Sequence, residues 1–398
     1  MSVAMLRVLT LSTLFPDAVR PNFGVFIERQ TIELAARGDV EVEVVAPLGI
    51  PPLVGGLHPR WAALARLPER ETWRALTVHR PRFAVVPGVG WASPHLLAAA
   101  LLPVLRDIRR RFPFDVIDAD FFWPDGPAAV ALGRRLGVPV SVKSRGADIH
   151  FWGTRRTTRR QVRAAARHAD AMLTVSAALK ADMVALGMPA DRIDVHYTGV
   201  DLDRFRPAPD REAAKAALGL SGPLFVAVGA LIPRKAHHLA IEALAMLPRG
   251  TLMIAGEGAE RDRLRALADG LGLGDRVRLL GRVAQAELTP YVAAADAAVL
   301  VSVSEGLANA WVEAIACGTP VIASDAGGAA ELIDRPEAGR IVPRDPAAIA
   351  DAMREVLTAR FPAGVVRETA LRFTWEANAR QLFEVLSGIV EARRQASA

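Results

Sequence analysis

The sequence predicts an α/β protein made of two doubly wound domains, and two observations support this prediction. Strand-like apolar runs alternate with amphipathic helix-like runs along most of the 398-residue chain, as is typical of βαβ units with parallel sheets. The alternation stops at a bridge rich in proline and charge, residues 196–220, and then begins again. At roughly 150 residues per domain, a chain of this length also fits two domains.

The elements of the first half follow each other with short turns. The predicted strands are 5–12, 41–47, 115–120 and 138–144, and helices are predicted over 25–38, 126–137 and 176–187. The segment 164–176 is predicted to be a helix followed by a strand. The 25–38 helix closes on Gly38, a residue that suits a helix end. We therefore expect a first Rossmann-like domain over residues 1–200.

The second half repeats the pattern over 201–374. Its predicted strands are 223–231, 250–258, 276–281, 296–302 and 319–325, separated by helix-like runs. The last stretch, 374–394, reads as a long amphipathic helix. Ligands of such sheets bind outside the carboxyl ends of the strands, so two such domains predict a site in a cleft between them.

Composition indicates a soluble cytoplasmic protein. Hydrophobic content is 51% and charged content 23%, values that are typical of a globular chain with a large core. The single cysteine excludes an internal disulfide and fits a reducing compartment. The N-terminal segment lacks the features of a signal peptide, and the apolar run near 96–105 is too short to span a bilayer.

Positive charge is concentrated in the first half of the chain. Residues 1–200 carry 26 Lys+Arg and 18 Asp+Glu, whereas 201–398 carry 23 and 25. Arginines 155, 156, 159, 160 and 163 recur at helical spacing. This face fits either an anionic membrane surface, at the inner side of the membrane, or a plain solvated helix. Nucleic acid is not an expected partner, because aromatic residues are only 6% of the chain and none alternates with these arginines.

The stretch 304–328, SEGLANAWVEAIACGTPVIASDAGG, contains two glutamates eight positions apart. Glu305 is predicted to lie in a turn after a strand, and Glu313 inside the helix that ends near Cys317. A helix start made of small residues exposes unpaired N–H groups to an anion. A carboxylate can accept hydrogen bonds from neighbouring hydroxyls of a sugar or ribose. Without its context the pair also fits a dipole-favoured glutamate and a solvated one.

Several segments together resemble family-4 (group 1) retaining glycosyltransferases, which have the two-domain GT-B fold. The matching segments are TGVDLDRFRP, VGALIPRKAHHLAIEAL, LMIAGEGAERDRL, VRLLGRV and the stretch 304–328, and their order and spacing agree with the family across roughly 195–340. The first half resembles the family more loosely, through PNFGVFIERQ and SVKSRGADI. The resemblance implies that the last helix packs back on the first domain.

The resemblance also implies roles for the donor-side residues. Glu305 would face the donor sugar and Glu313 would hold the nucleotide ribose, while the backbone of Gly306, Leu307, Ala308 and Asn309 would face the sugar or diphosphate. Arg234 and Lys235 would supply positive charge to the leaving diphosphate. The family commonly has an arginine where this chain has Ala230, so Arg234 or the helix amides would compensate. Gly256 and Gly258 would border the nucleotide, and Arg282 and Val283 the base.

In the first domain the resemblance points to Gly24, Arg145 and Asp148. Gly24 would approach the donor phosphates. Many relatives have histidine at the position of Arg145; an arginine stays protonated, so Arg145 would contact a phosphate or the acceptor rather than act as a base. Asp148 is then the candidate for a polar contact with the acceptor, and the alternative is that it caps the N-terminus of a helix.

The pair Asp118 and Asp120 raises the question of a metal. Two carboxylates alone make a poor Mg²⁺ site unless substrate phosphates complete the shell, and the pair lies at the end of a first-domain strand, away from the predicted diphosphate. We therefore expect no metal, and we expect Asp120 to line the acceptor side.

These observations predict a metal-independent, cofactor-free hexosyltransferase. It would move a sugar from a nucleoside-diphosphate sugar to a hydroxyl of a lipid-linked or polysaccharide glycan, with retention. The alternatives are a nucleotide-sugar epimerase or hydrolase on the same fold, and a non-catalytic nucleotide-sugar-binding partner. The sequence does not specify the donor nucleotide, the sugar, the acceptor or the oligomeric state.

Overall fold

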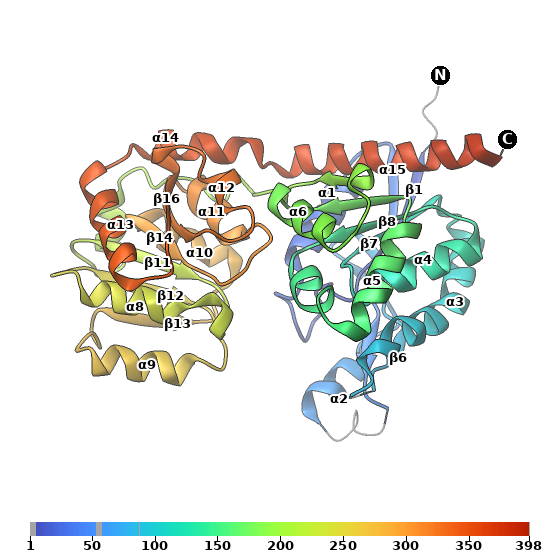
Figure 1. The fold of residues 1–398 in the computed structure, drawn as a ribbon, viewed down its shortest axis with the longest axis horizontal. Helices are drawn as coiled ribbons and strands as arrows, with labels where there is room; N and C mark the ends of the chain where they lie inside the picture. The colour runs from blue at the N-terminus through green and yellow to red at the C-terminus, as the bar shows by residue number, and fades with distance from the viewer. Residues whose placement is uncertain (1–4, 53–57, 87, 398) are drawn as a thin grey trace. The chain divides into compact units, whose positions relative to one another are not determined.

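The computed structural model describes residues 5–52, 58–86 and 88–397, and these form two compact units (Figure 1). Unit 1 takes the chain up to Gly199 together with the segment from Trp375 onward, and unit 2 is Val200–Thr374. Each unit has a mainly parallel sheet covered by helices. The predicted fold class, α/β with two Rossmann-like domains, is confirmed.

The main sheet of unit 1 has the strand order β10–β9–β8–β7–β1–β2–β5–β4. Its strands are β1 (Leu6–Leu11), β2 (Val40–Val45), β4 (Arg70–Trp73), β5 (Leu76–His79), β7 (Val116–Asp120), β8 (Val140–Ser144), β9 (Ala171–Thr174) and β10 (Ile193–Val195). β4 pairs antiparallel with β5, and the other pairs are parallel. A separate parallel pair is formed by β3 (Leu48–Ile50) and β6 (Arg82–Ala84). The chain winds outward in both directions from β1, which makes the β1–β7 boundary the switch point of this sheet.

The helices of unit 1 are α1 (Val25–Ala35), α2 (Pro59–Ala65), α3 (Ser93–Arg111), α4 (Asp125–Leu136), α5 (Arg156–His168), α6 (Ala177–Ala185) and α15 (Trp375–Ser397). The apolar run near 96–105 lies in α3. α15 packs on unit 1 as the resemblance implied: its Leu382, Leu386 and Val390 join a buried cluster with Leu34 of α1 and with strand residues of β1, β2 and β7.

The sheet of unit 2 has the order β13–β12–β11–β14–β15–β16 and is parallel throughout. Its strands are β11 (Leu224–Val228), β12 (Thr251–Ala255), β13 (Val277–Gly281), β14 (Ala297–Leu300), β15 (Val321–Ser324) and β16 (Gly339–Val342). In the unit's own chain order this is the 3-2-1-4-5-6 arrangement of dinucleotide-binding folds. The switch point lies between β11 and β14.

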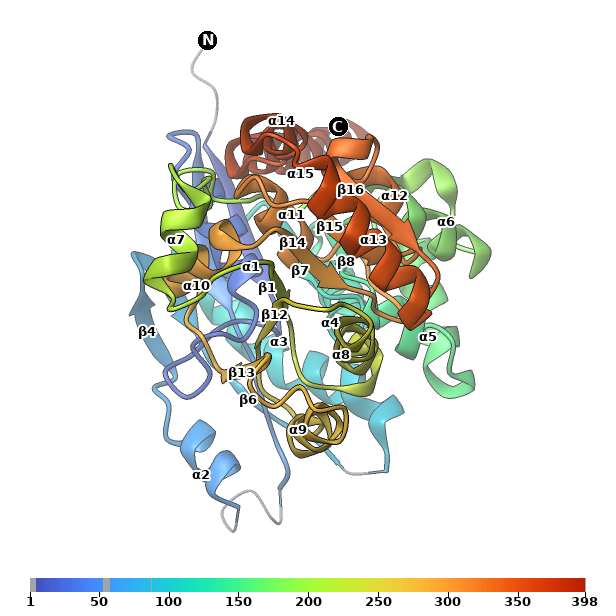
Figure 2. The same cartoon turned by 90° about the vertical axis from the view of Figure 1, so that its left-hand side faces the viewer.

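The helices of unit 2 are α7 (Arg211–Ala217), α8 (His237–Ala245), α9 (Arg261–Gly270), α10 (Gln285–Ala294), α11 (Asn309–Ala316), α12 (Ala329–Leu332), α13 (Pro346–Ala359) and α14 (Ala363–Glu368). Figure 2 shows α8, α9 and α13 on one side of the sheet and α10 and α11 on the other. With both faces covered, the central strands are almost entirely buried, which explains their continuous apolar sequences. α7 occupies part of the predicted bridge, so this segment is more regular than its proline and charge content suggested.

Among the helices that the structure describes, none is long and apolar enough to cross a membrane.

Candidate active site

The two strands at the switch point of unit 2 deliver the predicted donor-side charges. β11 leads into a short 3-10 turn, Pro233–Lys235, which contains Arg234 and Lys235. β14 leads into the loop that contains Glu305. Because parallel neighbours β11 and β14 end at the same edge of the sheet, residues some 70 positions apart in the sequence meet there.

Lys235, Arg234 and Glu305 form one ionic group. Lys235 Nζ lies 2.6 Å from Glu305 Oε1, and Arg234 Nη1 lies 3.4 Å from Glu305 Oε2. The Glu305 side chain is 9% exposed, whereas Lys235 is 14% and Arg234 40% exposed. Arg234 also donates to the carbonyl of Ser304 at 2.5 Å. One carboxylate therefore holds two cations, and the group keeps a net positive charge that partly faces solvent.

Gly256 and Gly258 let the backbones of two loops touch. A Cβ on Gly256 would overlap the carbonyl oxygen of Gly229, and one on Gly258 would overlap that of Leu231. The turn after β12 thus packs directly on the turn that carries Arg234 and Lys235, and Leu231 N donates to the carbonyl of Glu257 at 2.9 Å. Close packing of the two backbones therefore explains why glycine is needed at positions 256 and 258. A contact between these two glycines and a nucleotide stays a prediction.

The loop before α11 presents a helix start without a side-chain cap. α11 begins at Asn309, Ala308 precedes it in an extended conformation, and no side chain caps the first turn. Leu307 and Ala308 are buried, so their side chains hold the loop in place. The position of Glu305 in the turn and Glu313 in the helix is as predicted. Such an uncapped N-terminus favours an anion.

A second loop that the sequence analysis did not assign supports Glu305. Gly327 has φ 55°, and a Cβ there would overlap the carbonyl oxygens of Glu305 and Gly306. Gly328 N donates to the carbonyl of Gly306 at 2.7 Å. The signal in the sequence is the pair of glycines that follows strand β15, a position where backbone approach is to be expected.

Glu313 lies in surroundings unlike those of Glu305. Gln285 Nε2 donates to Glu313 Oε1 at 2.9 Å, and Arg204 Nη1 donates to Gln285 Oε1 at 3.5 Å. Burial raises the pKa of Glu313, while the Gln285 amide and the positive charge of Arg204 partly offset this rise. The sequence analysis did not identify Gln285 and Arg204 as neighbours of Glu313, because their contact depends on how α10 packs on α11. Cys317, one turn further on, is a buried packing residue whose pKa burial raises to about 12.

Arg282 and Val283 follow strand β13. Arg282 Nη2 lies 2.8 Å from Glu257 Oε2 in an exposed pair, and Val283 is partly buried. The pair ties the loop after β13 to the loop after β12. A contact between these residues and a base stays a prediction.

Unit 1 contains a closed polar network at the carboxyl ends of its central strands. Arg145 donates to Asp120 Oδ1 through Nη2 (2.6 Å) and Nε (2.9 Å), and Gln30 Nε2 donates to Asp120 Oδ2 at 2.8 Å. The Arg145 guanidinium also reaches Gln30 Oε1 and Thr198 Oγ1, and stacks 4.8 Å from the ring centre of Phe26. Asp120 is 0% and Arg145 6% exposed. Both oxygens of Asp120 are thus engaged, and an acceptor contact by either residue stays a prediction.

The same network includes a lysine and a histidine that the sequence analysis missed. Lys143 Nζ lies 2.8 Å from Gln30 Oε1 and 2.7 Å from His196 Nδ1. His196 Nε2 lies 2.9 Å from the carbonyl oxygen of Asn378; a carbonyl only accepts, so Nε2 bears the proton and Nδ1 accepts from Lys143. Burial lowers the pKa of Lys143 and of His196. The signal in the sequence was a lysine inside a strand whose neighbours are all apolar or small.

Asp148 organises the loop after β8. It is fully buried, and its carboxylate accepts from Phe122 N (2.8 Å), Gly146 N (2.8 Å), Arg145 N (3.1 Å) and Ser144 Oγ (3.1 Å). The backbone donors all precede Asp148 in the chain, and the short helix that begins at Asp148 has Ala147 as its N-cap and no side-chain cap. Asp148 therefore is not the N-cap of the alternative, and its contact with an acceptor stays a prediction. Burial still raises the pKa of Asp148, because these four donors offset only part of the desolvation.

Gly24 and two further aspartates complete this edge of unit 1. Gly24 has φ 75°, begins α1, and lies so close to the carbonyl of Leu14 that a Cβ would overlap it. Burial raises the pKa of Asp125 to about 8, and burial together with Asp120 raises that of Asp118 to about 7. Asp125 Oδ2 accepts from Thr13 N at 2.8 Å. Across the described residues no group of three or more His, Cys, Asp or Glu side chains is placed to hold a metal ion.

Comparison with known proteins identifies the class. Residues 210–381 match the family "Glycosyl transferases group 1", and residues 24–204 match "Glycosyltransferase Family 4". The chain is 33% identical over 325 residues to a D-inositol 3-phosphate glycosyltransferase of Frankia alni, covering 72% of this chain and 78% of that one. It is 29% identical over 363 residues to a putative teichuronic acid biosynthesis glycosyltransferase of Bacillus subtilis, covering 87% and 88%.

Solved structures agree on the fold. Sucrose-phosphate synthase of Thermosynechococcus elongatus superimposes with a TM-score of 0.80 at 23% identity, covering 97% of this chain and 100% of that one. Anabaena Alr3699/HepE in complex with UDP superimposes with a TM-score of 0.74 at 22% identity, covering 96% and 100%. The chain belongs to the group 1 glycosyltransferases and has their GT-B fold.

Proposed function

We propose that this glycosyltransferase moves a hexose from a nucleoside-diphosphate sugar to a hydroxyl acceptor, with retention at the anomeric carbon and without a metal or cofactor. The observation that supports the proposal most strongly is the Arg234–Lys235–Glu305 group at the switch point of unit 2. A relative in structure, Anabaena Alr3699/HepE, is described in complex with UDP-glucose, a donor of this class.

The two cations suit the leaving group. Negative charge grows on the diphosphate as the glycosidic bond breaks, and fixed positive groups lower the energy of that state. Lys235 and Arg234 stand beside the uncapped start of α11, whose amides add to the same field. In the proposal this arrangement takes the place that a divalent ion has in other nucleotide-sugar enzymes.

The two glutamates fit different hydroxyls. Glu305 holds Lys235 in position and offers its remaining acceptor capacity to the donor sugar. Glu313, which accepts from Gln285, is proposed to accept from the ribose. Retention would follow from same-face attack, in which the departing phosphate takes the acceptor's proton. The pairing of Glu305 with two cations supports this route, because it makes that carboxylate a weaker nucleophile.

Unit 1 is proposed to form the acceptor side. Asp120, Arg145 and Asp148 shape its loops from within and are positioning residues, since their polar atoms are engaged inside the unit. Gly24 fixes the start of α1 next to the loop after β1. We place the acceptor, a lipid-linked or polysaccharide glycan, beside these loops.

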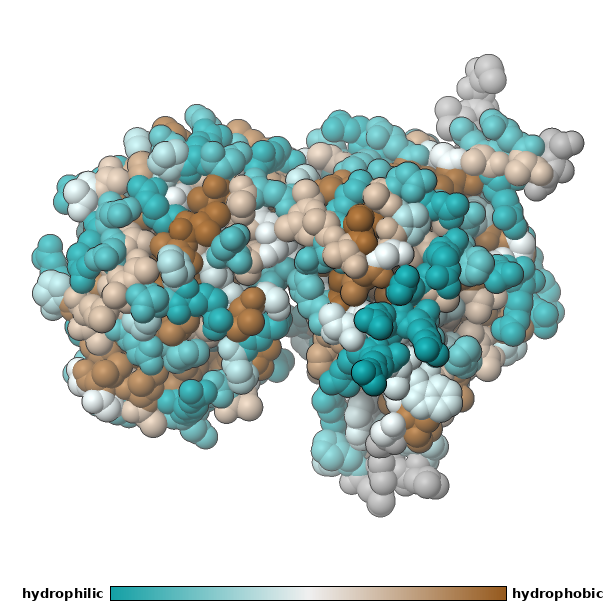
Figure 3. Space-filling view, viewed as in Figure 1, coloured by the Kyte–Doolittle hydropathy of each residue, from teal (hydrophilic) through white to brown (hydrophobic). Residues whose placement is uncertain are grey.

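A lipid-linked acceptor fits the surface around α5. The side chains of Arg155, Arg156, Arg159, Arg160 and Arg163 are exposed. Figure 3 shows a strongly hydrophilic patch over α5. Close by in sequence, Phe151 is 47% exposed, and Arg155 stacks 3.8 Å from its ring centre. Trp91, whose carbonyl accepts from Gln161 of α5, is 50% exposed. Cations beside exposed aromatic rings suit the interface of an anionic membrane.

A thermal-shift panel of nucleoside diphosphates and their sugars tests the donor site. We expect one nucleotide class to raise the Tm of the wild type, and Glu313→Ala to reduce that rise by weakening the ribose contact. Glu242→Ala, a partly buried glutamate of α8 in the same unit, is the matched control and should respond like wild type. If no nucleotide stabilises the wild type, or if Glu313→Ala responds identically, the donor assignment fails.

Product analysis with the stabilising donor separates the alternatives. Transfer to an added glycan acceptor with unchanged anomeric configuration supports the proposal. Turnover of the donor at the same rate without acceptor would point to an epimerase or hydrolase, and donor binding without turnover to a binding partner. Chelation with EDTA should leave the rate unchanged if no metal takes part.

Vesicle cosedimentation tests the membrane surface. We expect binding to vesicles rich in anionic phospholipid, loss of binding in Arg159→Gln/Arg160→Gln, and no loss in Arg263→Gln/Arg265→Gln on the exposed face of α9. Equal binding by both double variants would contradict docking through α5.

A further inference from the structure

Unit 2 has a cavity of about 830 Å³ at the edge of its sheet opposite to the donor loops. Pro223, Asp296 and Pro320 line it, and they directly precede strands β11, β14 and β15. Arg234, Lys235 and Glu305 instead follow β11 and β14. Strands of four or five residues place these two edges on the order of 15 Å apart. The cavity is therefore separate from the proposed donor site.

The lining of this cavity is rich in cations, although unit 2 as a whole carries slightly more acidic than basic residues. Residues 200–374 carry 20 Lys+Arg and 22 Asp+Glu. The cavity is lined by Arg211, Lys215, Arg249, Arg354 and Arg360, with only Glu212 and Asp296 as acids among its described lining residues. Clustering of like charge costs free energy unless an anion occupies the space.

The two acids do not neutralise the arginines. Lys215 Nζ lies 2.8 Å from both Glu212 Oε1 and Asp296 Oδ1, and Asp296 Oδ2 accepts from Leu224 N at 2.8 Å. Lys215 thus takes up both carboxylates. Arg354 is bound by Asp351 and by the carbonyl of Met246. Arg211 donates through Nη2 to the carbonyl of Gly318 at 2.8 Å, and Arg211, Arg249 and Arg360 have no carboxylate partner among the described residues.

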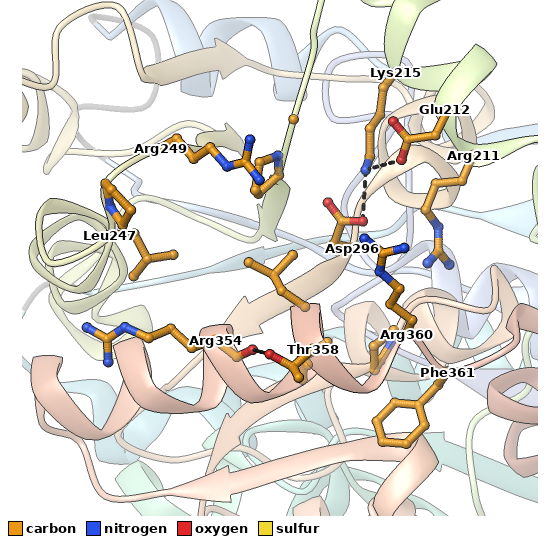
Figure 4. Close-up of a pocket in the computed structure, with 16 residues that line it drawn as sticks. Arg211, Glu212, Lys215, Leu247, Arg249, Asp296, Arg354, Thr358, Arg360 and Phe361 are labelled. Carbon is orange, nitrogen blue, oxygen red and sulfur yellow. Dashed lines mark hydrogen bonds and ion pairs between the residues drawn. The ribbon is translucent and has the colours of Figure 1, made fainter.

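Arg360 occupies a backbone position that favours glycine. It ends α13 with φ 46° and ψ 52°, the left-handed conformation, which costs a residue with a Cβ about 1 kcal/mol or more relative to glycine. In Figure 4 the guanidinium groups of Arg211 and Arg360 point toward the same part of the wall, near Asp296, and Arg249 lies on another side of the cavity. The chain thus has an arginine facing the cavity where its backbone would favour a glycine.

The cavity also has apolar walls. Leu247, Val356, Leu357 and Phe361 contribute them, between the cations. A volume of this size is typical of small-molecule sites, which combine apolar surface with a few charged anchors. Paired guanidinium groups recognise phosphate through several N–H donors at once.

We propose that this cavity is a second binding site, which takes a small phosphorylated molecule with its phosphate at Arg211 and Arg360 and its remaining part against Leu247, Val356 and Leu357. Arg249 adds long-range attraction from another side. The site is distinct from the donor loops and does not depend on the proposed sugar transfer.

Thermal shift of the full chain at constant ionic strength tests this site, with glucose 6-phosphate, inorganic phosphate and glucose as probes. We expect glucose 6-phosphate to raise Tm by roughly 5 °C at a hundredfold excess over its dissociation constant. Inorganic phosphate should give a smaller rise and glucose none. Arg360→Gly and Arg211→Gln should lose the rise. Arg360→Gly is informative because glycine suits the backbone there, so without probe it should be at least as stable as wild type.

Two control variants test whether the phosphate binds in this cavity or elsewhere in the unit. Arg265→Gln removes an exposed arginine of α9 in the same unit, outside the cavity, and should keep the full rise. Lys235→Met removes a donor-loop cation and should also keep it. The proposal is overturned if neither phosphate probe raises Tm, if glucose is as effective, or if the rise persists in Arg360→Gly but disappears in Lys235→Met.

Discussion

The two units place charged side chains at the same topological position but use them differently. In both, the charges lie at the carboxyl ends of the central parallel strands beside the switch point. In unit 1 Arg145 is 6% exposed and bound by Asp120, Gln30 and Thr198. In unit 2 Arg234 is 40% and Lys235 14% exposed, and they share a single carboxylate. A closed network stabilises its own unit, whereas an open, net-positive group remains available to an anion.

This contrast predicts opposite consequences for substitutions at equivalent places. Removing a member of the unit 1 network should cost stability first, because it leaves buried partners unpaired. Removing a member of the unit 2 group should cost function first, because solvent can replace the lost contact in the free protein.

The largest expected effect is that of Asp120→Ala. It leaves the buried Arg145 guanidinium without its carboxylate, which should lower the free energy of unfolding by about 3–5 kcal/mol. Hydrogen exchange of the β7 and β8 amides would report it. Asp107→Ala, which breaks an exposed pair with Arg110 on α3, is the control and should cost less than about 1 kcal/mol. Similar losses in both variants would mean that the network is not the stabilising element.

Lys235→Met should chiefly reduce activity. If Lys235 stabilises the leaving diphosphate as proposed, its loss should lower kcat by about 10²–10³-fold and change the free energy of unfolding by no more than roughly 1 kcal/mol. Rates with the stabilising donor, together with urea unfolding, give both values. Lys235→Arg should recover part of the rate, and Lys180→Met on α6 should not change it. An unaltered rate in Lys235→Met would contradict the role of this cation.

Asp125→Asn should change how stability depends on pH. The folded-state pKa of Asp125 is raised to about 8 from an ordinary value of 3.8, so between these values the unfolded state releases a proton that the folded state keeps. The wild type should therefore lose stability relative to the variant as pH rises from about 4 to 8, by at most about 1.4 kcal/mol per pH unit. Unfolding at several pH values measures the difference. Parallel curves would show that Asp125 does not titrate differently in the two states.

The smallest expected effect on stability is that of Gly272→Ala, which is the control for Gly327→Ala. Both glycines have left-handed backbones, with φ 55° and 69°, but a Cβ on Gly272 meets open space, whereas one on Gly327 overlaps the backbone of Glu305 and Gly306. Each should cost about 1 kcal/mol of backbone strain, and Gly327→Ala should cost more than this, because the overlapping backbone must shift. Only Gly327→Ala should also weaken the thermal shift produced by the donor, since it displaces the Glu305 loop. If Gly272→Ala weakens that shift equally, the loop contact is not what matters.

Local sequence features were sufficient to predict the fold class and the loops that carry the proposed donor site. The alternation of strand-like and helix-like runs predicted the central strands of both sheets, because a strand buried on two faces must be apolar along its whole length, but it did not predict β4, β5, β10 or β16. The position of Glu305 in a turn and Glu313 in a helix followed from the small residues before α11 and from the glycine after it. Lys235 could be placed at the correct end of β11 because parallel strands all end at one edge.

Partners distant in the sequence could not be predicted in this way. Lys143 and His196 are 53 positions apart, and Gln285 and Glu313 are 28 apart. Asp120, at the end of a strand, and Asp148, after the next one, were predicted to lie on the acceptor side, and the sequence did not show that their oxygens are engaged inside unit 1. The cationic cavity joins α7, α13 and the amino ends of three strands, segments with no common motif.

Features that depend on neighbours along the chain could therefore be predicted from the sequence: the order of the central strands and helices, the glycines at close approaches, and the charges that follow each strand. Only the packing of distant segments determines which of those charged side chains are buried and fully paired, and which remain partly exposed to solvent. The physical reason is that burial and pairing depend on which strands become neighbours in the sheet and which helices cover them. Those contacts put Asp120 and Arg145 out of reach of water, and left Lys235 and Arg234 facing it.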